Sequence, residues 1–182
     1  MVDDIHIKRV LRREAWESAI HARKFQRILD KLSPEQAKGA PGGERGLPED
    51  LLNSLQKEVT DKYNEMLHHI RSSWVFQKNG IVAWQLMDHA MEKMKQIAHF
   101  AEGIAENGLT PKFKPGKIDS GKDIGKALKT LSDNMTKSQK RHMKLRRDRE
   151  LNKHGGMVIN LDLTIQQEQY EAEELKDMVR KK

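Results

Sequence analysis

The chain has 182 residues, of which 36% are hydrophobic and 34% are charged, with a formal net charge of +7 and no cysteine. Without cysteine it cannot form disulfides, thiolate metal sites or a cysteine nucleophile. No apolar run approaches the length of a membrane span and residues 1–4 lack a signal-peptide pattern, so we expect a cytoplasmic protein without a membrane partner. Few large aliphatic residues and an aromatic content of 5% favour long helices with narrow apolar stripes over a β fold.

The excess positive charge lies in one block of the sequence. Residues 1–111 contain 16 Lys or Arg and 16 Asp or Glu and are therefore neutral. Residues 112–153 contain 14 basic and 5 acidic residues, a local charge of +9, whereas residues 154–182 contain 4 basic and 6 acidic residues, a charge of −2. We divide the chain accordingly into a helical domain (1–111), a basic connector with a long basic helix (112–153), and a C-terminal strand with a charged tail (154–182).

Three helices are expected in the first segment. Apolar residues at three- and four-residue steps predict a helix over residues 4–32, and the Gly- and Pro-rich stretch after it predicts a flexible loop near residues 33–48. A second helix follows Pro48, because a first helical turn tolerates the missing N–H. Its apolar stripe consists of Leu52, Leu55, Val59, Tyr63, Met66, Ile70 and Trp74.

A third helix is expected over residues 81–106, ending at Asn107-Gly108. Because Asn-Gly also joins β-strands, a β-hairpin over residues 75–83 is the alternative for the preceding turn. The helix is apolar on two sides, one of which carries Met87, Met91 and Met94. Such methionines can form a pliable groove for a partner, but at helical spacing they more often pack in a core, and we interpret them as core residues.

The C-terminal part combines a basic helix with a change of period. A fourth helix is expected over residues 120–153, with Ser120 and Asp123 at its start. Its apolar edge consists of Ile124, Leu128, Leu131 and Met135. In residues 157–165 apolar and polar residues then alternate, which is the pattern of a half-buried strand. The alternating apolar residues are Met157, Ile159, Leu161, Leu163 and Ile165.

A lone strand cannot satisfy its own backbone, so we expect it to pair with the same strand of other subunits and the protein to be a homo-oligomer. The tail, residues 166–182, is interpreted as a short helix or a disordered segment. The predicted fold class is mainly α. Long amphipathic helices form helical hairpins or a bundle, and the one short C-terminal strand serves oligomer assembly.

Catalytic motifs are not evident in the sequence. It contains no Gly-rich phosphate loop, nucleophile elbow or zinc-protease motif. The best metal candidate is Glu65 with His68, at the i, i+3 spacing of di-iron bundles, and further candidate ligands lie on the next helix. These are Asp88, Glu92, His99 and Glu102. A second such motif is missing, so we interpret these residues as solvated polar positions and predict no enzymatic activity, no metal and no cofactor.

The basic block carries the functional prediction. A solvated face that only maintains solubility mixes both charge signs, whereas a local charge of +9 suits a polyanion, which releases counterions on binding. We therefore predict non-specific, salt-dependent binding of nucleic acid, and DNA in particular. The residues expected to contact it are Lys137, Lys140, Arg141, Lys144, Arg146, Arg147, Arg149 and Lys153. The alternative is a scaffold subunit of a larger assembly, whose basic block meets an acidic protein partner.

Two segments carry a resemblance to a known family. Residues 121–131 (Gly-Lys-Asp-Ile-Gly-Lys-Ala-Leu-Lys-Thr-Leu) and the expected strand over 157–165 are similar to the oligomerising helix and C-terminal strand of the small terminase subunit of tailed bacteriophages. The resemblance implies a non-catalytic ring in the host cytoplasm. It also implies that this ring binds viral DNA during packaging and regulates a large motor ATPase.

Overall fold

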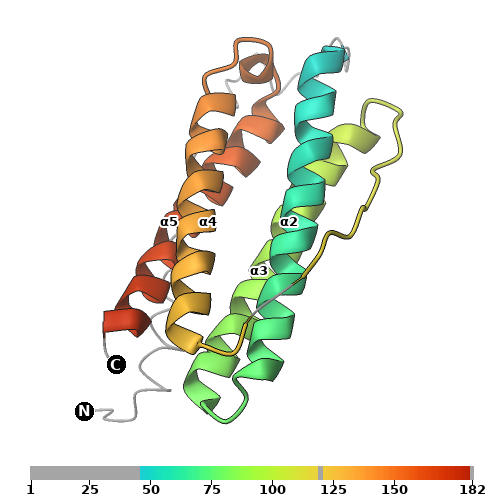
Figure 1. The fold of residues 1–182 in the computed structure, drawn as a ribbon. Coiled ribbons are helices and arrows are strands. Elements are labelled where there is room, and N and C mark those ends of the chain that lie inside the picture. Colours follow the sequence, from blue (N-terminus) through green and yellow to red (C-terminus); the bar gives the residue numbers. More distant parts are fainter. Residues whose placement is uncertain (1–45, 119–120, 181–182) are drawn as a thin grey trace, which may run out of the picture. The chain divides into compact units, whose positions relative to one another are not determined.

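The computed structural model of the protein describes residues 46–118 and 121–180. Within these ranges the elements are α2 (Glu49–Val75), α3 (Gly80–Ala105), α4 (Ile124–Leu145), the 3-10 turn η2 (Leu151–Lys153) and α5 (Gly155–Arg180). Helices α2 and α3 form one hairpin, α4 and α5 form another, and the two hairpins pack into a four-helix bundle (Figure 1). The mainly helical fold class is thereby confirmed. The helix predicted over residues 4–32 and most of the loop near 33–48 lie outside the described residues, and the division at residues 111 and 153 stays a prediction.

Polar caps set the beginnings of two of these helices. The Asn79 side chain accepts a hydrogen bond from the Val82 N–H at 3.2 Å, and α3 begins directly after it. The alternative of a β-hairpin over residues 75–83 is therefore wrong, because Asn79-Gly80 separates two helices. Asp123 caps α4 by accepting from the Lys126 N–H at 2.9 Å. Helix α4 ends at Leu145 and not near residue 153 as predicted, because a turn and η2 follow it.

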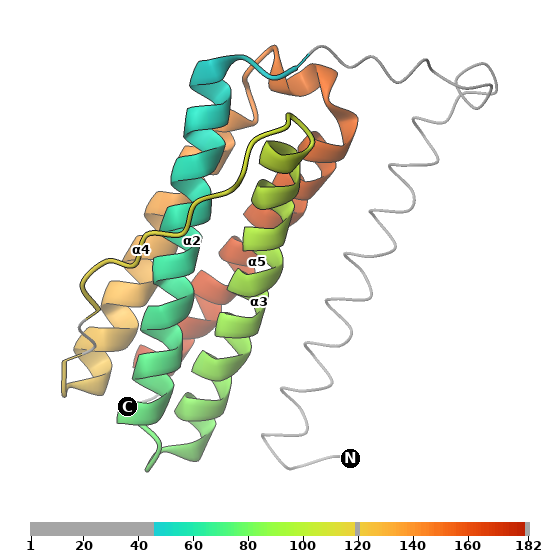
Figure 2. The same ribbon diagram turned by 90° about the vertical axis from the view of Figure 1, so that its right-hand side faces the viewer.

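The connector between the hairpins runs along α2, as Figure 2 shows. Gln56 binds the backbone of Lys112 twice, through its amide nitrogen at 2.6 Å and its amide oxygen at 2.8 Å. The Asn64 side chain accepts from the Gly116 N–H at 2.6 Å, and the ring of Phe113 lies edge-on to Tyr63. These side-chain hydrogen bonds replace the regular backbone pairing that the Pro- and Lys-rich segment does not form.

Apolar side chains occupy the two ends of the bundle. One cluster joins α2, α3, η2 and α5, with Leu55, Phe100 and Leu161 among its buried members. The other joins the α2–α3 turn and the first part of α3 to α4 and α5, and its fully buried members are Leu86, Leu128 and Leu175. The predicted apolar edge of α4 is confirmed by the burial of Leu128, Leu131 and Met135. Between the two clusters most of the buried residues are polar, among them Lys62, Lys93, His142, Glu168 and Glu171.

The predicted C-terminal strand is wrong, because residues 157–165 belong to the continuous helix α5. Met157, Ile159, Leu161 and Leu163 are buried in this helix and Ile165 is half-buried. One buried stripe of α5, at three- and four-residue steps, consists of Met157, Leu161, Thr164, Glu168, Glu171, Leu175 and Met178. Because the middle of this stripe is polar, the apolar residues of α5 alone do not show a helical period. The alternation in residues 157–165, at the N-terminal end of the helix, therefore predicted a strand. The reason given for a homo-oligomer is lost with the strand, so the oligomer stays a prediction without that support.

The two apolar sides of α3 have different surroundings. Leu86, Ala90 and Phe100 on one side are buried in the bundle. On the other side, Met91 and Met94 are each 57% exposed. The interpretation of these two methionines as core residues is therefore wrong.

We expect Leu161→Ala on α5 to lower the free energy of unfolding by about 2–5 kcal/mol, because it leaves a cavity among buried apolar side chains. Urea unfolding followed by circular dichroism measures the change. Gln169→Ala, at an exposed position of the same helix, is the matched control and should change stability by less than about 0.5 kcal/mol. Equal stability of the two variants would contradict the packing of α5.

Candidate functional site

The predicted nucleic-acid-binding residues divide into two groups. Lys137, Lys140 and Lys144 lie on α4 with exposed side chains, and Arg147 and Arg149 are exposed in the turn after it. In the part of the chain that the structure describes, these five form no ion pair. They remain available to an external anion.

Arg141 and Arg146 instead bridge helices inside the protein. The Arg141 Nε lies 3.0 Å from Glu58 Oε1, and its Nη2 lies 3.1 Å from Asp61 Oδ2, so this guanidinium joins α4 to α2. The Arg146 Nε lies 2.8 Å from Asp162 Oδ1 on α5. Lys153 is mostly exposed and pairs locally with Glu150 at 2.7 Å. The candidate surface is therefore smaller than the predicted set.

The exposed basic residues of α4 continue toward its N-terminus as one stripe. Positions 126, 129, 133, 137, 140 and 144 follow each other at three- or four-residue steps, so they share one face of the helix. All six are exposed, and five are lysines, the exception being Asp133. We call Lys126, Lys129, Lys137, Lys140 and Lys144 the lysine stripe. At 1.5 Å per residue it extends over about 27 Å. Lys126 and Lys129 were not among the predicted contact residues, although their spacing from Lys137 was a usable signal.

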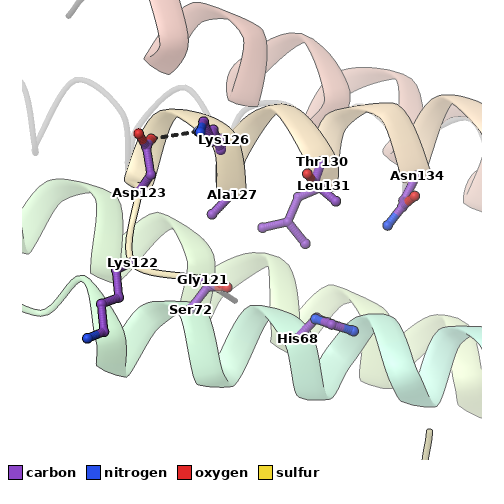
Figure 3. Close-up of a pocket in the computed structure, with 10 residues that line it drawn as sticks. All are labelled: His68, Ser72, Gly121, Lys122, Asp123, Lys126, Ala127, Thr130, Leu131 and Asn134. Carbon is purple, nitrogen blue, oxygen red and sulfur yellow. Dashed lines mark hydrogen bonds between the residues drawn. The ribbon is translucent and has the colours of Figure 1, made fainter. Parts of the chain in front are cut away.

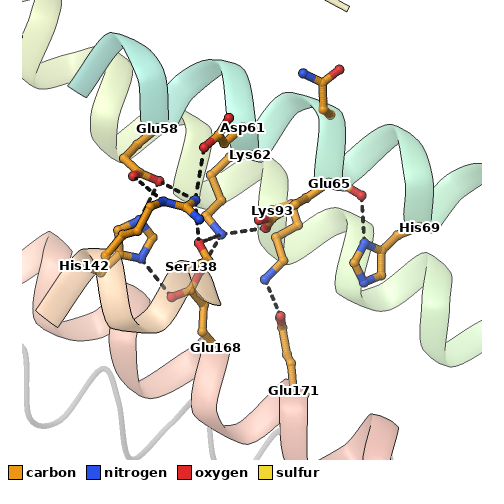
Figure 4. Close-up of polar contacts among 12 residues, drawn as sticks. Glu58, Asp61, Lys62, Glu65, His69, Lys93, Ser138, His142, Glu168 and Glu171 are labelled. Atoms are coloured by element: carbon orange, nitrogen blue, oxygen red, sulfur yellow. Dashed lines mark hydrogen bonds and ion pairs between the residues drawn. The ribbon is translucent and has the colours of Figure 1, made fainter. Parts of the chain in front are cut away.

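The opposite face of α4 meets a buried ionic layer between the two apolar clusters (Figure 4). Lys62 of α2 contacts Glu168 of α5, and its Nζ also lies 2.6 Å from Glu65 Oε2 and 2.8 Å from Ser138 Oγ. Lys93 of α3 pairs with Glu171 of α5. The side chains of both ion pairs have no solvent exposure. Each pair crosses from one hairpin to the other.

His142 of α4 lies between two carboxylates of this layer. Its Nδ1 is 2.8 Å from Glu168 Oε2, and its Nε2 is 2.9 Å from Glu58 Oε2. Burial alone lowers the pKa of His142, but the hydrogen bonds to Glu168 and Glu58 outweigh burial and raise the pKa above 6.5. Burial alone also raises the pKa of Glu58, and the hydrogen bonds from His142 and Arg141 reverse this shift and lower the pKa to about 2.

Lys62 and Glu168, the neighbouring ion pair, are likewise kept charged by their partners. Burial opposes the charge on Lys62, but Glu168 and Glu65 outweigh it and raise the pKa of Lys62. Burial likewise opposes the charge on Glu168, and Lys62 together with a hydrogen bond from His142 holds the pKa of Glu168 well below its usual range. The layer therefore consists of charged groups that stabilise each other.

A pair of histidine rings, His69 and His89, ends the layer on the side of the α2–α3 turn. The ring of His69 lies 5.7 Å from that of His89, and His69 Nδ1 is 2.7 Å from the Glu65 carbonyl oxygen. Burial lowers the pKa of His69 to about 3, with His89 and Lys93 adding to the effect, so the ring is neutral and donates this hydrogen bond through Nδ1. Among the described residues no three His, Asp or Glu side chains are arranged to hold a metal ion.

Two hollows lie between α2 and α4, one on each side of the bridge formed by Arg141 and the Lys62–Ser138 contact. The hollow in Figure 3 has a volume of about 500 Å³ and is lined by residues that include His68, Lys122 and Thr130. The other measures about 570 Å³ and has Lys57, Lys144 and Arg147 on its walls. Along this side of the bundle, α2 and α4 therefore meet through long polar side chains.

The geometry separates two kinds of charge. The buried ionic layer is closed to solvent, so its main function is to join the hairpins. The lysine stripe is open to solvent and presents like charges at regular intervals, so a partner can reach it. None of the helices in the described part combines the length and hydropathy needed to cross a bilayer.

We expect Lys93→Met to lower the free energy of unfolding by about 3–5 kcal/mol, because it leaves the Glu171 charge buried without its ion-pair partner. The double variant Lys93→Met/Glu171→Leu should recover most of this loss, because apolar residues of similar volume replace a buried pair at little cost. Urea titrations of both variants measure the two values. Lys57→Met, which breaks the exposed pair with Asp61, is the control, and a comparable loss in this control would contradict the role of burial.

The depressed pKa of Glu58 predicts an acid dependence of stability. A carboxyl with a lower pKa in the folded state contributes stability above its unfolded value of 4.5, and this stability is lost as the pH falls toward about 2. Glu58→Gln should lower stability at neutral pH and flatten the decline between these two values. Urea unfolding at a series of pH values measures both effects, with Glu173→Gln at an exposed position of α5 as the control. A Glu58→Gln curve that declines as steeply as the wild type would contradict this account.

No protein-family model matches the chain, and no curated protein matches it.

Proposed function

We propose that the protein is a non-catalytic nucleic-acid-binding protein that holds a phosphate backbone along the lysine stripe of α4. The observation that carries the proposal is the spacing of five exposed lysines on one helical face. Arg147, directly after the helix, continues the surface without an ion pair among the described residues. These side chains offer positive charge to any sequence of bases, so the expected binding is non-specific.

A polyanion fits this surface better than a small anion does. A small anion needs several donors that converge on one point, whereas the stripe extends about 27 Å along a helix. Phosphates along a strand provide a row of charges of similar extent, and each contact releases a counterion. We expect duplex DNA to bind and to dissociate as the salt concentration rises.

A second candidate is a scaffold subunit whose stripe meets an acidic protein. The exposed side of α3 with Met91 and Met94 favours some protein contact. Homo-oligomer formation and regulation of a motor ATPase, as in the small terminase subunit, also stay proposals. The strand that contributed to that resemblance is part of a helix, so the proposal of nucleic-acid binding rests on the stripe alone.

Binding of a fluorescein-labelled DNA duplex, measured by anisotropy at several salt concentrations, tests the proposal. We expect the triple variant Lys137→Glu/Lys140→Glu/Lys144→Glu to raise Kd at least about tenfold and to reduce the log–log salt slope by about 2.7, or about 0.9 per lost contact. Lys78→Glu/Lys95→Glu/Lys176→Glu changes the net charge equally at exposed lysines outside α4. This control should bind nearly as well as the wild type.

Equal losses in both triple variants would show an effect of net charge alone and would contradict a role for the stripe. If the wild type bound neither duplex DNA nor single-stranded RNA at low salt, the nucleic-acid proposal would fail. The scaffold candidate would then remain.

A further inference from the structure

The fully buried apolar side chains of α4 all lie in its first half. Its buried apolar residues are Ala127, Leu128, Leu131 and Met135. In residues 136–145 the buried residues are Ser138 and His142. The apolar cluster nearest to this half has no buried member from α4, and the one α4 side chain packed against it, Leu145, is only partly buried. The second half of α4 is therefore held mainly by polar contacts, and such segments have low local stability.

These polar contacts lead to both neighbouring sides of the bundle. Ser138 accepts from Lys62 of α2, Arg141 pairs with Glu58 and Asp61 of α2, and His142 reaches Glu58 of α2 and Glu168 of α5. Of these residues, His142 alone contacts both α2 and α5. The protonation state of His142 therefore decides whether its ring can link Glu58 of α2 to Glu168 of α5.

The geometry around His142 requires a charged ring. A neutral imidazole carries one N–H, whereas both ring nitrogens lie within 2.9 Å of a carboxylate oxygen. Only the imidazolium can donate to both carboxylates. After loss of the proton, one ring nitrogen directs a lone pair at a buried carboxylate, which is repulsive.

Several other charged groups surround this ring. Glu58 and Lys62 face it from α2 and Glu168 from α5, while Arg141 is its neighbour on α4. From α3, the ring centroid of Phe100 lies 5.2 Å from that of His142, and the charge of Lys93 helps to lower the pKa of Glu168. Arg141 favours the ionised form of Glu58, and Lys62 and Lys93 favour that of Glu168. Loss of the His142 proton therefore leaves both acids charged and removes one of their two hydrogen-bond donors on this ring.

We propose that residues 136–145 form a proton-controlled latch, which is held on the bundle while His142 is charged and detaches from α2 when His142 loses its proton. The outer face of the same segment carries Lys137, Lys140 and Lys144. Detachment therefore changes how three of the five lysines of the stripe are presented to a polyanion. This consequence for binding rests on the proposed function, whereas the latch itself does not.

The direction of the pH effect follows from the raised pKa of His142. A histidine with a higher pKa in the folded state contributes stability that is complete below its unfolded value of 6.5. This contribution is lost as the pH rises through the raised folded pKa. The latch is therefore closed below pH 6.5 and opens as the pH rises through the raised pKa of His142.

Hydrogen exchange of the full chain, followed by mass spectrometry at a series of pH values, tests the latch. After correction for the intrinsic pH dependence of exchange, peptides from residues 139–145 should lose protection at least about tenfold relative to peptides from 124–135 as the pH rises. Uniform protection along α4 over the whole series would overturn the proposal.

Two variants assign the response to His142. In His142→Gln the second half of α4 should exchange faster at every pH, and the pH response should disappear. In Glu58→Gln, which removes one carboxylate that stabilises the imidazolium, the loss of protection should begin at lower pH. His68→Gln on α2 is the matched control and should keep the wild-type profile. A wild-type pH response in both His142→Gln and Glu58→Gln would overturn the latch, and circular dichroism confirms that each variant is folded.

Duplex binding measured over the same pH series separates the two proposals. A pH-dependent latch without any duplex affinity would contradict the proposed function and leave the latch intact. Duplex affinity without a pH response in exchange would contradict the latch and leave the proposed function intact.

Discussion

The central constraint in this bundle is the need to neutralise charges that have been removed from water. Lys62 and Lys93 have no solvent exposure, and an isolated buried ammonium is strongly unfavourable. Each therefore requires a carboxylate from the other hairpin, which α5 supplies through Glu168 and Glu171. The pairs fix the rotation of α5 and its register against α2 and α3, because a shift by one residue would separate them.

Such a layer contributes specificity more than stability. Buried ion pairs gain little over apolar residues of the same volume, whereas a misplaced partner leaves a charge unpaired. The apolar clusters at the two ends of the bundle provide the hydrophobic driving force. The ionic layer between them selects one arrangement of the hairpins.

Helix α4 joins this interior to the surface. Its inner face places Ser138 and His142 in the ionic layer, and its outer face carries the lysine stripe. Arg141 lies at the boundary, where its pairs with Glu58 and Asp61 make it part of the framework. A mutation of this arginine therefore changes the fold as well as the surface charge, and only the stripe lysines report on binding alone.

The sequence by itself determined the mainly helical class, α2 and α3 with the turn between them, the apolar edge of α4 and the basic block. These features are local, because they depend on helical period, capping residues and composition. Only the tertiary structure decided that residues 157–165 are helical and that Arg141 and Arg146 point to internal partners. The physical reason is that the core-facing residues at the middle of α5, Thr164, Glu168 and Glu171, are polar. The burial of the two glutamates depends on lysines that lie more than 70 residues away in the sequence. No pattern within α5 reveals such partners, so the sequence predicted a strand over residues 157–165 and a separate tail over 166–182.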